Sequence, residues 1–261
     1  MPGEHAPDFQ EQRDYDTLWN ISYLRHAFMK YHTLSVIIPA YNEKNTIGEI
    51  IRRVQSVDIG ELTKEIIVVD DGSTDGTRDI IKTIPDIRYI FHEKNRGKGG
   101  AIKTGFQSAT GDLLIIQDAD LEYDPNDYPS LIGPILDGYA DVVFGSRFLT
   151  GRPHRVLLFH HHLANMFLTF LANLFTNINF TDMETGYKVF TKEVAQKLTP
   201  VLESQRFGIE PEIAIRCARM KVRIYEIGIT YYGRGYDEGK KITWKDGVAA
   251  VWHIIKFRFF R

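Results

Sequence analysis

The chain has 261 residues, of which 43% are hydrophobic and 25% charged, enough for one substantial α/β core. A net charge of −2 gives no electrostatic reason to expect nucleic acid as a partner. The single cysteine, Cys217, excludes an internal disulfide and fits a reducing compartment. It lies in a helix-like stretch, so we expect a small buried hydrophobic side chain rather than a nucleophile.

Three segments differ in pattern along the chain. Residues 1–32 are an extension that begins with a polar, acidic stretch over residues 1–16, unlike a signal peptide, and has apolar residues at roughly helical spacing from Leu18 to Phe28. Residues 33–241 show the pattern of one α/β catalytic domain. Residues 242–261 have the pattern of a C-terminal amphipathic helix.

Short apolar runs alternate with helical patterns through the central segment. We expect strands over residues 34–39, 65–70, 88–91, 113–117 and 141–144. We expect helices over residues 46–57, 77–83 and 100–108, with a glycine-rich loop before the last. This alternation predicts βαβ units and a mainly parallel central sheet, in which ligands bind beyond the carboxyl ends of the strands.

Three carboxylates follow the fourth predicted strand, at Asp118, Asp120 and Glu122. Two carboxylates two residues apart point the same way if the chain stays extended, and hard oxygen ligands suit Mg²⁺ or Mn²⁺. A divalent ion there can stabilise charge on a departing diphosphate. The alternative is a solvated turn before a helix that begins near Asp124-Pro125.

Polar residues also follow the first two strands. Asp70 can accept hydrogen bonds from a ribose hydroxyl or a base N–H, or it can belong to a turn that caps the next helix. Pro39 ends the first strand, Tyr41 can stack on a base, and Glu43 is equally a first-turn acid of the following helix. Neither Gly-x-Gly-x-x-Gly nor a Walker motif comes after this strand, which argues against a dinucleotide oxidoreductase or a P-loop enzyme.

Further motifs extend this pattern over most of the chain, from about residue 34 to about residue 241. Together they are Ser35-Val-Ile-Ile-Pro-Ala-Tyr-Asn-Glu43, Ile67-Val-Val-Asp-Asp-Gly-Ser-Thr-Asp-Gly76, Asn95-Arg-Gly-Lys-Gly-Gly100, Asp118-Ala-Asp120, Gly145-Ser-Arg147, Asp182-Met-Glu-Thr-Gly-Tyr-Lys188 and Phe207-Gly-Ile-Glu-Pro-Glu212. In these motifs the chain resembles the family 2 glycosyltransferases, and within them the dolichyl- or polyprenyl-phosphate sugar synthases. The resemblance implies a GT-A (Rossmann-like) fold, an inverting transfer and a divalent metal, Mg²⁺ or Mn²⁺.

The resemblance also implies roles for single residues. Those that would hold the nucleoside of a UDP- or GDP-hexose are Pro39, Tyr41, Glu43 and Asp70. Those that would hold the metal and diphosphate are Asp118 and Asp120, with Glu122 where the family often has glutamine.

Basic residues complete the implied site. Arg147 would pair with a phosphate, since a guanidinium suits a planar, multi-oxygen target, although a plain surface arginine is the alternative. Residues 232–241 resemble the family's late basic loop, which contributes Arg234 and Lys240 to phosphate binding. The family commonly has a serine before that lysine, whereas Gly239 stands there in this chain, so its register stays open. The implied catalytic residues are Asp120, Arg147 and Asp182.

The acceptor decides which chemistry is needed. A lipid phosphate is already an anion and needs cationic positioning, whereas a hydroxyl acceptor needs a general base. Candidates for that base are Asp182, Glu184 and Glu210. We predict an inverting transfer of a hexose to a polyprenyl (dolichyl-type) phosphate. The alternative is transfer to a hydroxyl of a glycan, a glycolipid or a small molecule.

Two apolar segments suggest a membrane surface as a partner. Residues 163–175 are almost wholly apolar but too short to span a bilayer, so a buried core helix and an interfacial helix both fit. The C-terminal residues that share one helical face, beside Lys256, Arg258 and Arg261, are Trp244, Val248, Val251, Trp252, Ile255 and Phe259. Aromatic and basic residues together are typical of an interface, and a helix packed on the catalytic domain is the alternative. We therefore expect a cytoplasmic protein, peripheral at the cytoplasmic face of the membrane.

Overall fold

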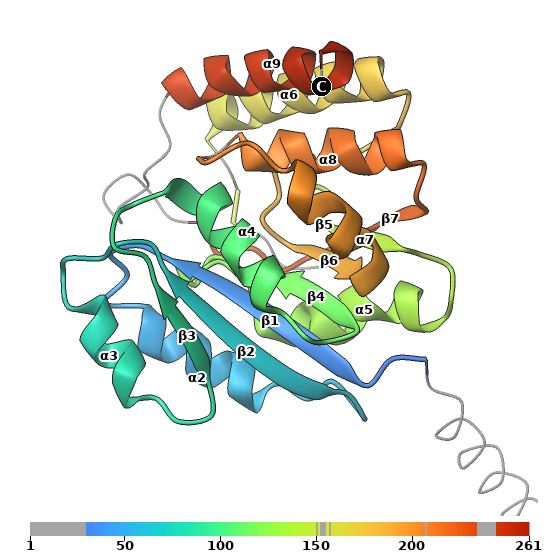
Figure 1. Cartoon of the computed structure of the whole chain (residues 1–261). Coiled ribbons are helices and arrows are strands. Elements are labelled where there is room, and N and C mark those ends of the chain that lie inside the picture. Colours follow the sequence, from blue (N-terminus) through green and yellow to red (C-terminus); the bar gives the residue numbers. More distant parts are fainter. Residues whose placement is uncertain are drawn as a thin grey trace, which may run out of the picture.

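The computed structural model describes residues 30–149, 151, 155–156, 158–206, 208–233 and 244–260. Within these residues the strands form one seven-stranded sheet (Figure 1) in the order β3-β2-β1-β4-β6-β5-β7. The strands are β1 (Thr33–Ala40), β2 (Thr63–Asp70), β3 (Arg88–Phe91), β4 (Leu113–Ile116), β5 (Val142–Ser146), β6 (Lys188–Thr191) and β7 (Ile224–Gly228).

The sheet is mainly parallel, as predicted. Strands β3, β2, β1 and β4 pair in parallel, as do β5 and β7, whereas β6 runs antiparallel between β4 and β5. The five predicted strands are confirmed, but β6 and β7 were not predicted. The fully buried Lys188 opens β6, and β7 contains Glu226 and has no fully buried residue, so neither strand is a plain apolar run.

Helices cover both faces of the sheet (Figure 1). They are α2 (Ile47–Ser56), α3 (Thr77–Thr83), α4 (Gly97–Ser108), α5 (Tyr128–Leu136), α6 (Phe159–Thr176), α7 (Lys192–Leu198), α8 (Ile209–Met220) and α9 (Trp244–Phe259). Helices α2 and α5 pack on one face, and α4, α7 and α8 pack on the other. Helices α6 and α9 lie side by side beyond α8, at the top of Figure 1.

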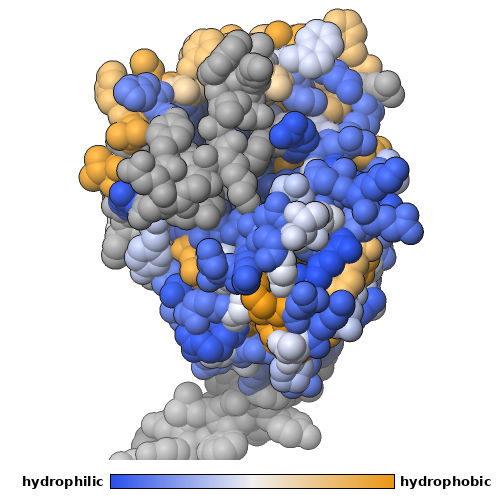
Figure 2. Space-filling view, turned by 90° about the vertical axis from the view of Figure 1, so that its left-hand side faces the viewer, coloured by the Kyte–Doolittle hydropathy of each residue, from blue (hydrophilic) through white to orange (hydrophobic). Residues whose placement is uncertain are grey.

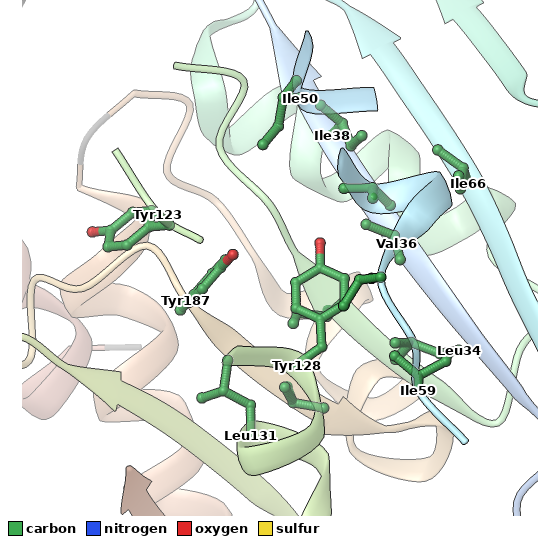
Figure 3. Packing of buried hydrophobic residues seen from close by; sticks show 14 of the residues in the cluster. Leu34, Val36, Ile38, Ile50, Ile59, Ile66, Tyr123, Tyr128, Leu131 and Tyr187 are labelled. Atoms are coloured by element: carbon green, nitrogen blue, oxygen red, sulfur yellow. The ribbon is translucent and has the colours of Figure 1, made fainter. Parts of the chain in front are cut away.

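Strand β1 supplies side chains to both faces of the sheet. Val36 and Ile38 pack in the cluster under α2 and α5, whereas Ile37 points into the cluster under α4. Figure 3 shows the first cluster, in which Tyr128 lies near Val36 of β1 and Tyr187 lies between Tyr123 and Tyr128. All these side chains are buried, and each contributes about 1.5–3 kcal/mol to folding.

Several predicted boundaries differ from the structure by one to three residues, and the ends of β1 and α4 have a clear physical reason. Strand β1 continues through Pro39 to Ala40, because Pro39 lies beyond Ile37, the last residue of β1 that pairs with β4, and its missing N–H therefore removes no hydrogen bond from that ladder. Helix α4 begins at Gly97, so the last three residues of the predicted glycine-rich loop are helical. Gly97 and Gly99 lie against the backbone carbonyls of residues 204–205, where no Cβ would fit.

The predicted interior position of Cys217 is confirmed. Its thiol is buried in α8, and burial raises its pKa to about 12, so it is not a nucleophile at neutral pH. The predicted C-terminal helix is confirmed as α9, although the side chains of Trp244 and Val248, and Arg261, lie outside the described residues. No helix in the described ranges is long and apolar enough to cross a membrane. The helical pattern predicted for residues 18–28 also lies outside them.

Candidate active site

The ends of β1 and β2 meet at one edge of the sheet. Ala40 pairs with Asp70 in register, and the Asp71 amide donates to the Ala40 carbonyl at 2.8 Å. Asp70 is fully buried, and its Oδ1 accepts hydrogen bonds from Arg78 and from the Ser73 amide. Its Oδ2 has no partner among the described residues. A buried carboxylate oxygen is costly without a donor, so a bound base or ribose can supply one there.

Tyr41 and Glu43 follow β1 at the same edge. Tyr41 is 41% exposed, so its ring is available to a nucleoside. Glu43 lies at the start of α2, where its carbonyl accepts from the Thr46 and Ile47 amides and its Oε2 accepts from the Thr46 hydroxyl at 2.8 Å. These contacts support a role for Glu43 at the helix start without testing a nucleoside contact.

Asp71 has a positioning role that was not predicted. Its carboxylate accepts hydrogen bonds from the Arg96 and Gly97 amides, at 2.8 and 2.6 Å, and contacts His92 Nδ1 at 2.7 Å. It therefore fixes the first turn of α4 against the end of β2. This placement brings Lys98, in the same turn, towards β4.

The three candidate metal ligands follow β4, and each is half-buried. Both oxygens of Asp118 contact the Lys98 ammonium, at 2.7 and 2.9 Å. Asp120 Oδ1 accepts from the Glu122 amide at 3.1 Å, and Glu122 Oε2 accepts from the Tyr231 hydroxyl at 3.0 Å. Asp118 is therefore held by Lys98, whereas Asp120 and Glu122 are linked to each other and Glu122 is linked to Tyr231.

Lys98 belongs to a buried network of two cations and two carboxylates. Its ammonium also lies 2.9 Å from Glu210, which in turn contacts the fully buried Lys188. Burial lowers the pKa of Lys98, but Asp118 and Glu210 outweigh it, so the net pKa is raised and the lysine stays charged. Glu210 shows the converse, because the two lysines outweigh burial and lower its pKa.

Arg147 and Asp182 form a buried ion pair. Arg147 Nε and Nη2 donate to Asp182 Oδ2 and Oδ1 at 2.7 and 2.8 Å, and the Arg147 amide donates at 3.0 Å. Asp182 is fully buried, and Arg147 is 13% exposed. Burial raises the pKa of Asp182, but the Arg147 charge and hydrogen bonds outweigh it, so the net pKa is lowered and the carboxylate is ionised.

Two tyrosines connect the ion pair with the carboxylates after β4. Tyr231 donates to Glu122 while its ring lies 5.3 Å from the Arg147 guanidinium. The Tyr123 ring lies 5.7 Å from that of Tyr231, and its hydroxyl accepts from the Gly186 amide at 2.9 Å. A Cβ at Gly186 would collide with the Asp118 carboxylate, so contact runs unbroken from Asp118 to Arg147.

A family model named "Glycosyl transferase family 2" matches residues 35–199, which include most of β1, all of β2 to β6, and Asp70, Asp118, Asp120, Arg147 and Asp182. This chain belongs to glycosyl transferase family 2. The transferase is 29% identical over 213 residues to UDP-N-acetylglucosamine–dolichyl-phosphate N-acetylglucosaminyltransferase of Methanococcus voltae, covering 74% of this chain and 83% of the relative. It is also 29% identical over 200 residues to glycosyltransferase AglJ of Haloferax volcanii, covering 76% of this chain and 63% of that one.

Solved structures confirm the GT-A fold of the transferase. Glucosyl-3-phosphoglycerate synthase of Mycobacterium tuberculosis, in complex with Mn²⁺, uridine diphosphate and phosphoglyceric acid, aligns with a TM-score of 0.70 at 20% identity. The alignment covers 98% of this chain and 85% of the synthase. At this identity the likeness shows the fold alone.

The carboxylates of the transferase fit a divalent metal by their chemistry. Asp118 already binds a cationic group through both oxygens, and its side chain is 16% exposed, so it is reachable by an ion. Carboxylate oxygens are the ligands that Mg²⁺ and Mn²⁺ prefer. In the part of the chain that the structure describes, no three His, Cys, Asp or Glu side chains gather as a metal site, so the ligand set remains a proposal.

Glu184 is the titratable group with the most unusual environment beside this site. Its Oε1 has no partner among the described residues. Burial, and then the charge of Glu210, raise its pKa to about 7. The group is therefore poised to gain or lose a proton near neutral pH.

Arg234 and Lys240 lie outside the described residues. The structure instead brings in residues that were not predicted as site residues, chiefly Lys98, Tyr123 and Tyr231. Lys98 stands in the Asn95–Gly100 motif and was recognisable there as a cation. The two tyrosines carried no signal, because only the fold places them between Asp118 and Arg147.

Proposed function

We propose that this transferase moves a hexose from a nucleoside diphosphate sugar to a polyprenyl phosphate, with inversion at the anomeric carbon. The observation that carries the proposal is the unbroken contact from the Asp118 carboxylate to the Arg147 guanidinium through Tyr123 and Tyr231. A carboxylate that can hold a metal-bound diphosphate therefore lies close to a cation that can bind the acceptor phosphate.

Uridine is the proposed base of the donor. The Methanococcus voltae relative is named for UDP-N-acetylglucosamine, and the Mycobacterium tuberculosis synthase was solved with uridine diphosphate. In this chain the nucleoside would contact Tyr41 and the Asp70 Oδ2, which no described residue bonds, beside Pro39 and Glu43. Two adjoining strand ends supply these groups, as is usual for ligands in open α/β sheets.

Asp118 and Asp120 would hold Mg²⁺ or Mn²⁺, with Glu122 beside them. When bound, the ion neutralises charge on the departing diphosphate. Arg147 positions the acceptor phosphate oxygen against the anomeric carbon, and Asp182 orients the guanidinium through its two oxygens. Because a phosphate monoester is already anionic near pH 7, this acceptor needs no general base.

A lipid phosphate as acceptor is supported by the dolichyl phosphate in the name of the Methanococcus voltae relative. One observation favours the second candidate, a hydroxyl acceptor. Glu184 has a pKa of about 7 and can take a proton from an attacking hydroxyl. The two candidates differ in their need for this residue, so Glu184→Gln separates them.

The test incubates the purified full chain with UDP-hexoses, Mn²⁺ and a polyprenyl phosphate. The expected product is a lipid-linked sugar phosphate that mild acid cleaves, formed equally well by Glu184→Gln. Transfer only to hydroxyl acceptors, giving an acid-stable glycoside and lost in Glu184→Gln, would replace the leading proposal with the second.

Metal use is tested in the same assay. Chelation should abolish transfer, and Mn²⁺ should restore it in the wild type. Asp120→Asn should lower turnover by about 10²-fold or more, as expected for loss of charge stabilisation at the leaving group. Asp137→Asn, which removes an exposed carboxylate after α5, is the matched control and should change nothing. Full activity of Asp120→Asn with chelator present would refute the metal assignment.

A further inference from the structure

Helix α6 has its apolar side facing outwards. The large side chains on this side are all more than half exposed, namely Leu163, Met166, Phe167, Phe170 and Leu174. They follow one another at helical spacing, so they form one stripe. The opposite side, which is buried, carries the polar residues Asn165 and Thr169 beside Leu168 and Ala172. A helix on the surface of a globular protein normally has the reverse arrangement.

Helix α9 extends this stripe into a wider surface. Among its described side chains, the exposed aromatic residues are Trp252 and Phe259 at 58% and 61%, and Phe260 follows at 71%. The Phe259 ring contacts Phe175 at the end of α6, edge to face at 5.5 Å, so the two helices present one continuous apolar platform. Figure 2 shows the hydrophobic residues gathered at the upper end of the molecule, above a mostly hydrophilic body.

Charge is distributed unevenly over the platform. Helix α6 contains no Asp, Glu, Lys or Arg in its 18 residues. Helix α9 has two basic residues in its last turn, of which Lys256 pairs with Glu203 at 3.0 Å, whereas Arg258 is exposed next to Phe259. Apolar side chains with tryptophan, phenylalanine and basic residues at one margin match the hydrocarbon boundary and the anionic head groups of a bilayer.

The buried side of α6 touches the candidate site. The Asn165 amide donates to Asp182 Oδ1 at 3.3 Å, and Thr169 Oγ1 accepts from the Met183 amide at 3.3 Å. His162 packs edge to face on Phe148, the neighbour of Arg147, at 5.0 Å. One helix, about 10–12 Å across, therefore separates the exposed stripe from the ion pair.

We infer that the α6–α9 platform docks this transferase on a lipid bilayer and that α6 is the wall between the bilayer and the acceptor site. The inference rests on the proposed function, because a lipid-borne phosphate must reach Arg147 from the membrane. The platform inserts its aromatic and aliphatic side chains at the interface, with Arg258 at the head groups. The polar side of α6 then keeps Asp182 and its partner in place a helix width from the lipid.

Vesicle flotation of the full chain tests the docking. Wild-type protein should float with vesicles of phosphatidylcholine and phosphatidylglycerol. Phe167→Gln combined with Phe170→Gln should lower the partition coefficient by about tenfold or more, because two exposed aromatic side chains no longer enter the interface. The control is Tyr139→Gln, which removes an aromatic side chain that is 62% exposed after α5 and should float like wild type. Arg258→Gln should weaken binding to these vesicles about fivefold.

Activity separates this inference from the proposed function. On a long-chain polyprenyl phosphate in vesicles, the double variant should lose turnover in proportion to its binding. On a short, water-soluble isoprenyl phosphate it should match wild type. A wild-type protein that floats but glycosylates neither phosphate would refute the proposed function and support the docking surface.

Several results would overturn the docking. One is a double variant that floats as well as wild type, and another is a wild type that does not float while still using the soluble phosphate. A wild-type dimer that the double substitution dissociates, without flotation, would show that the platform joins two copies of the chain. If the double variant lost much of its thermal stability but floated like wild type, another part of the chain would cover the platform.

Discussion

Replacing Asp182 by asparagine tests the centre of the site most directly. The change keeps the side-chain shape but leaves the Arg147 guanidinium, only 13% exposed, without its negative partner. Removing one member of a buried ion pair typically costs about 3–5 kcal/mol. Because Arg147 keeps some contact with solvent, we expect about 3 kcal/mol. That is a large part of the roughly 5–15 kcal/mol by which a typical protein is stable.

The loss should depend on pH with a definite sign. Arg147 holds the pKa of Asp182 below its ordinary value in spite of burial. The pair therefore stabilises the fold above the unfolded-state pKa of about 3.9, and the stabilisation is lost as the pH falls through the lower folded-state pKa. Wild type and Asp182→Asn should differ most near pH 7 and converge in strong acid.

Urea unfolding followed by tryptophan fluorescence measures this difference, and Asp141→Asn supplies a matched control. Asp141 pairs with Arg223 at 2.7 Å, but these side chains are 29% and 56% exposed, so its loss should cost about 1 kcal/mol or less. The double variant Arg147→Met/Asp182→Leu removes both buried charges and should regain most of the stability. Its transferase activity should stay lost, because no cation remains for the acceptor phosphate.

Two outcomes would refute this reasoning. If Asp182→Asn lost no more stability than Asp141→Asn, Arg147 would not depend on Asp182 to compensate its buried charge. If the double variant transferred sugar at the wild-type rate, Arg147 would have no part in binding the acceptor.

Three further predictions concern neighbouring groups. Glu184 has a pKa of about 7 in the folded state, above its unfolded value, so the free energy of unfolding should fall by about 3 kcal/mol as pH rises from about 4.5 to 7. Urea titrations across this range should show the slope in wild type and not in Glu184→Gln. Gly186→Ala places a methyl group against the Asp118 carboxylate and should lower turnover by about tenfold or more, whereas Gly133→Ala, which has open space around it, should not. Asp70→Asn should weaken uridine diphosphate binding about tenfold in calorimetry, and equal affinity would remove Asp70 from the nucleoside site.

Much of the sheet was predictable because its strands are short, β-branched runs that obey local rules. The runs that became β1, β2 and β4 are buried on both faces, so their composition alone separates them from amphipathic helices. Strand β6 escaped notice because Lys188 opens it, and a buried lysine is acceptable only where Glu210 reaches it from α8. The start of α4 was misplaced because Gly97 and Gly99 suggest a loop, whereas the structure uses them for close packing.

The sequence by itself determined which residues stand at the ends of strands, and hence that Asp70, Asp118 and Arg147 share one edge of the sheet. This information is local, since it depends on the period of apolar residues and on the polar residues directly after each run. Only the tertiary structure decided that Arg147 pairs with Asp182, that Tyr231 links the pair to Glu122, and that the apolar side of α6 faces outwards. Charge pairing and burial depend on which distant segments of the chain come into contact. An apolar stripe on a helix has the same spacing whether it packs in the core or faces outwards.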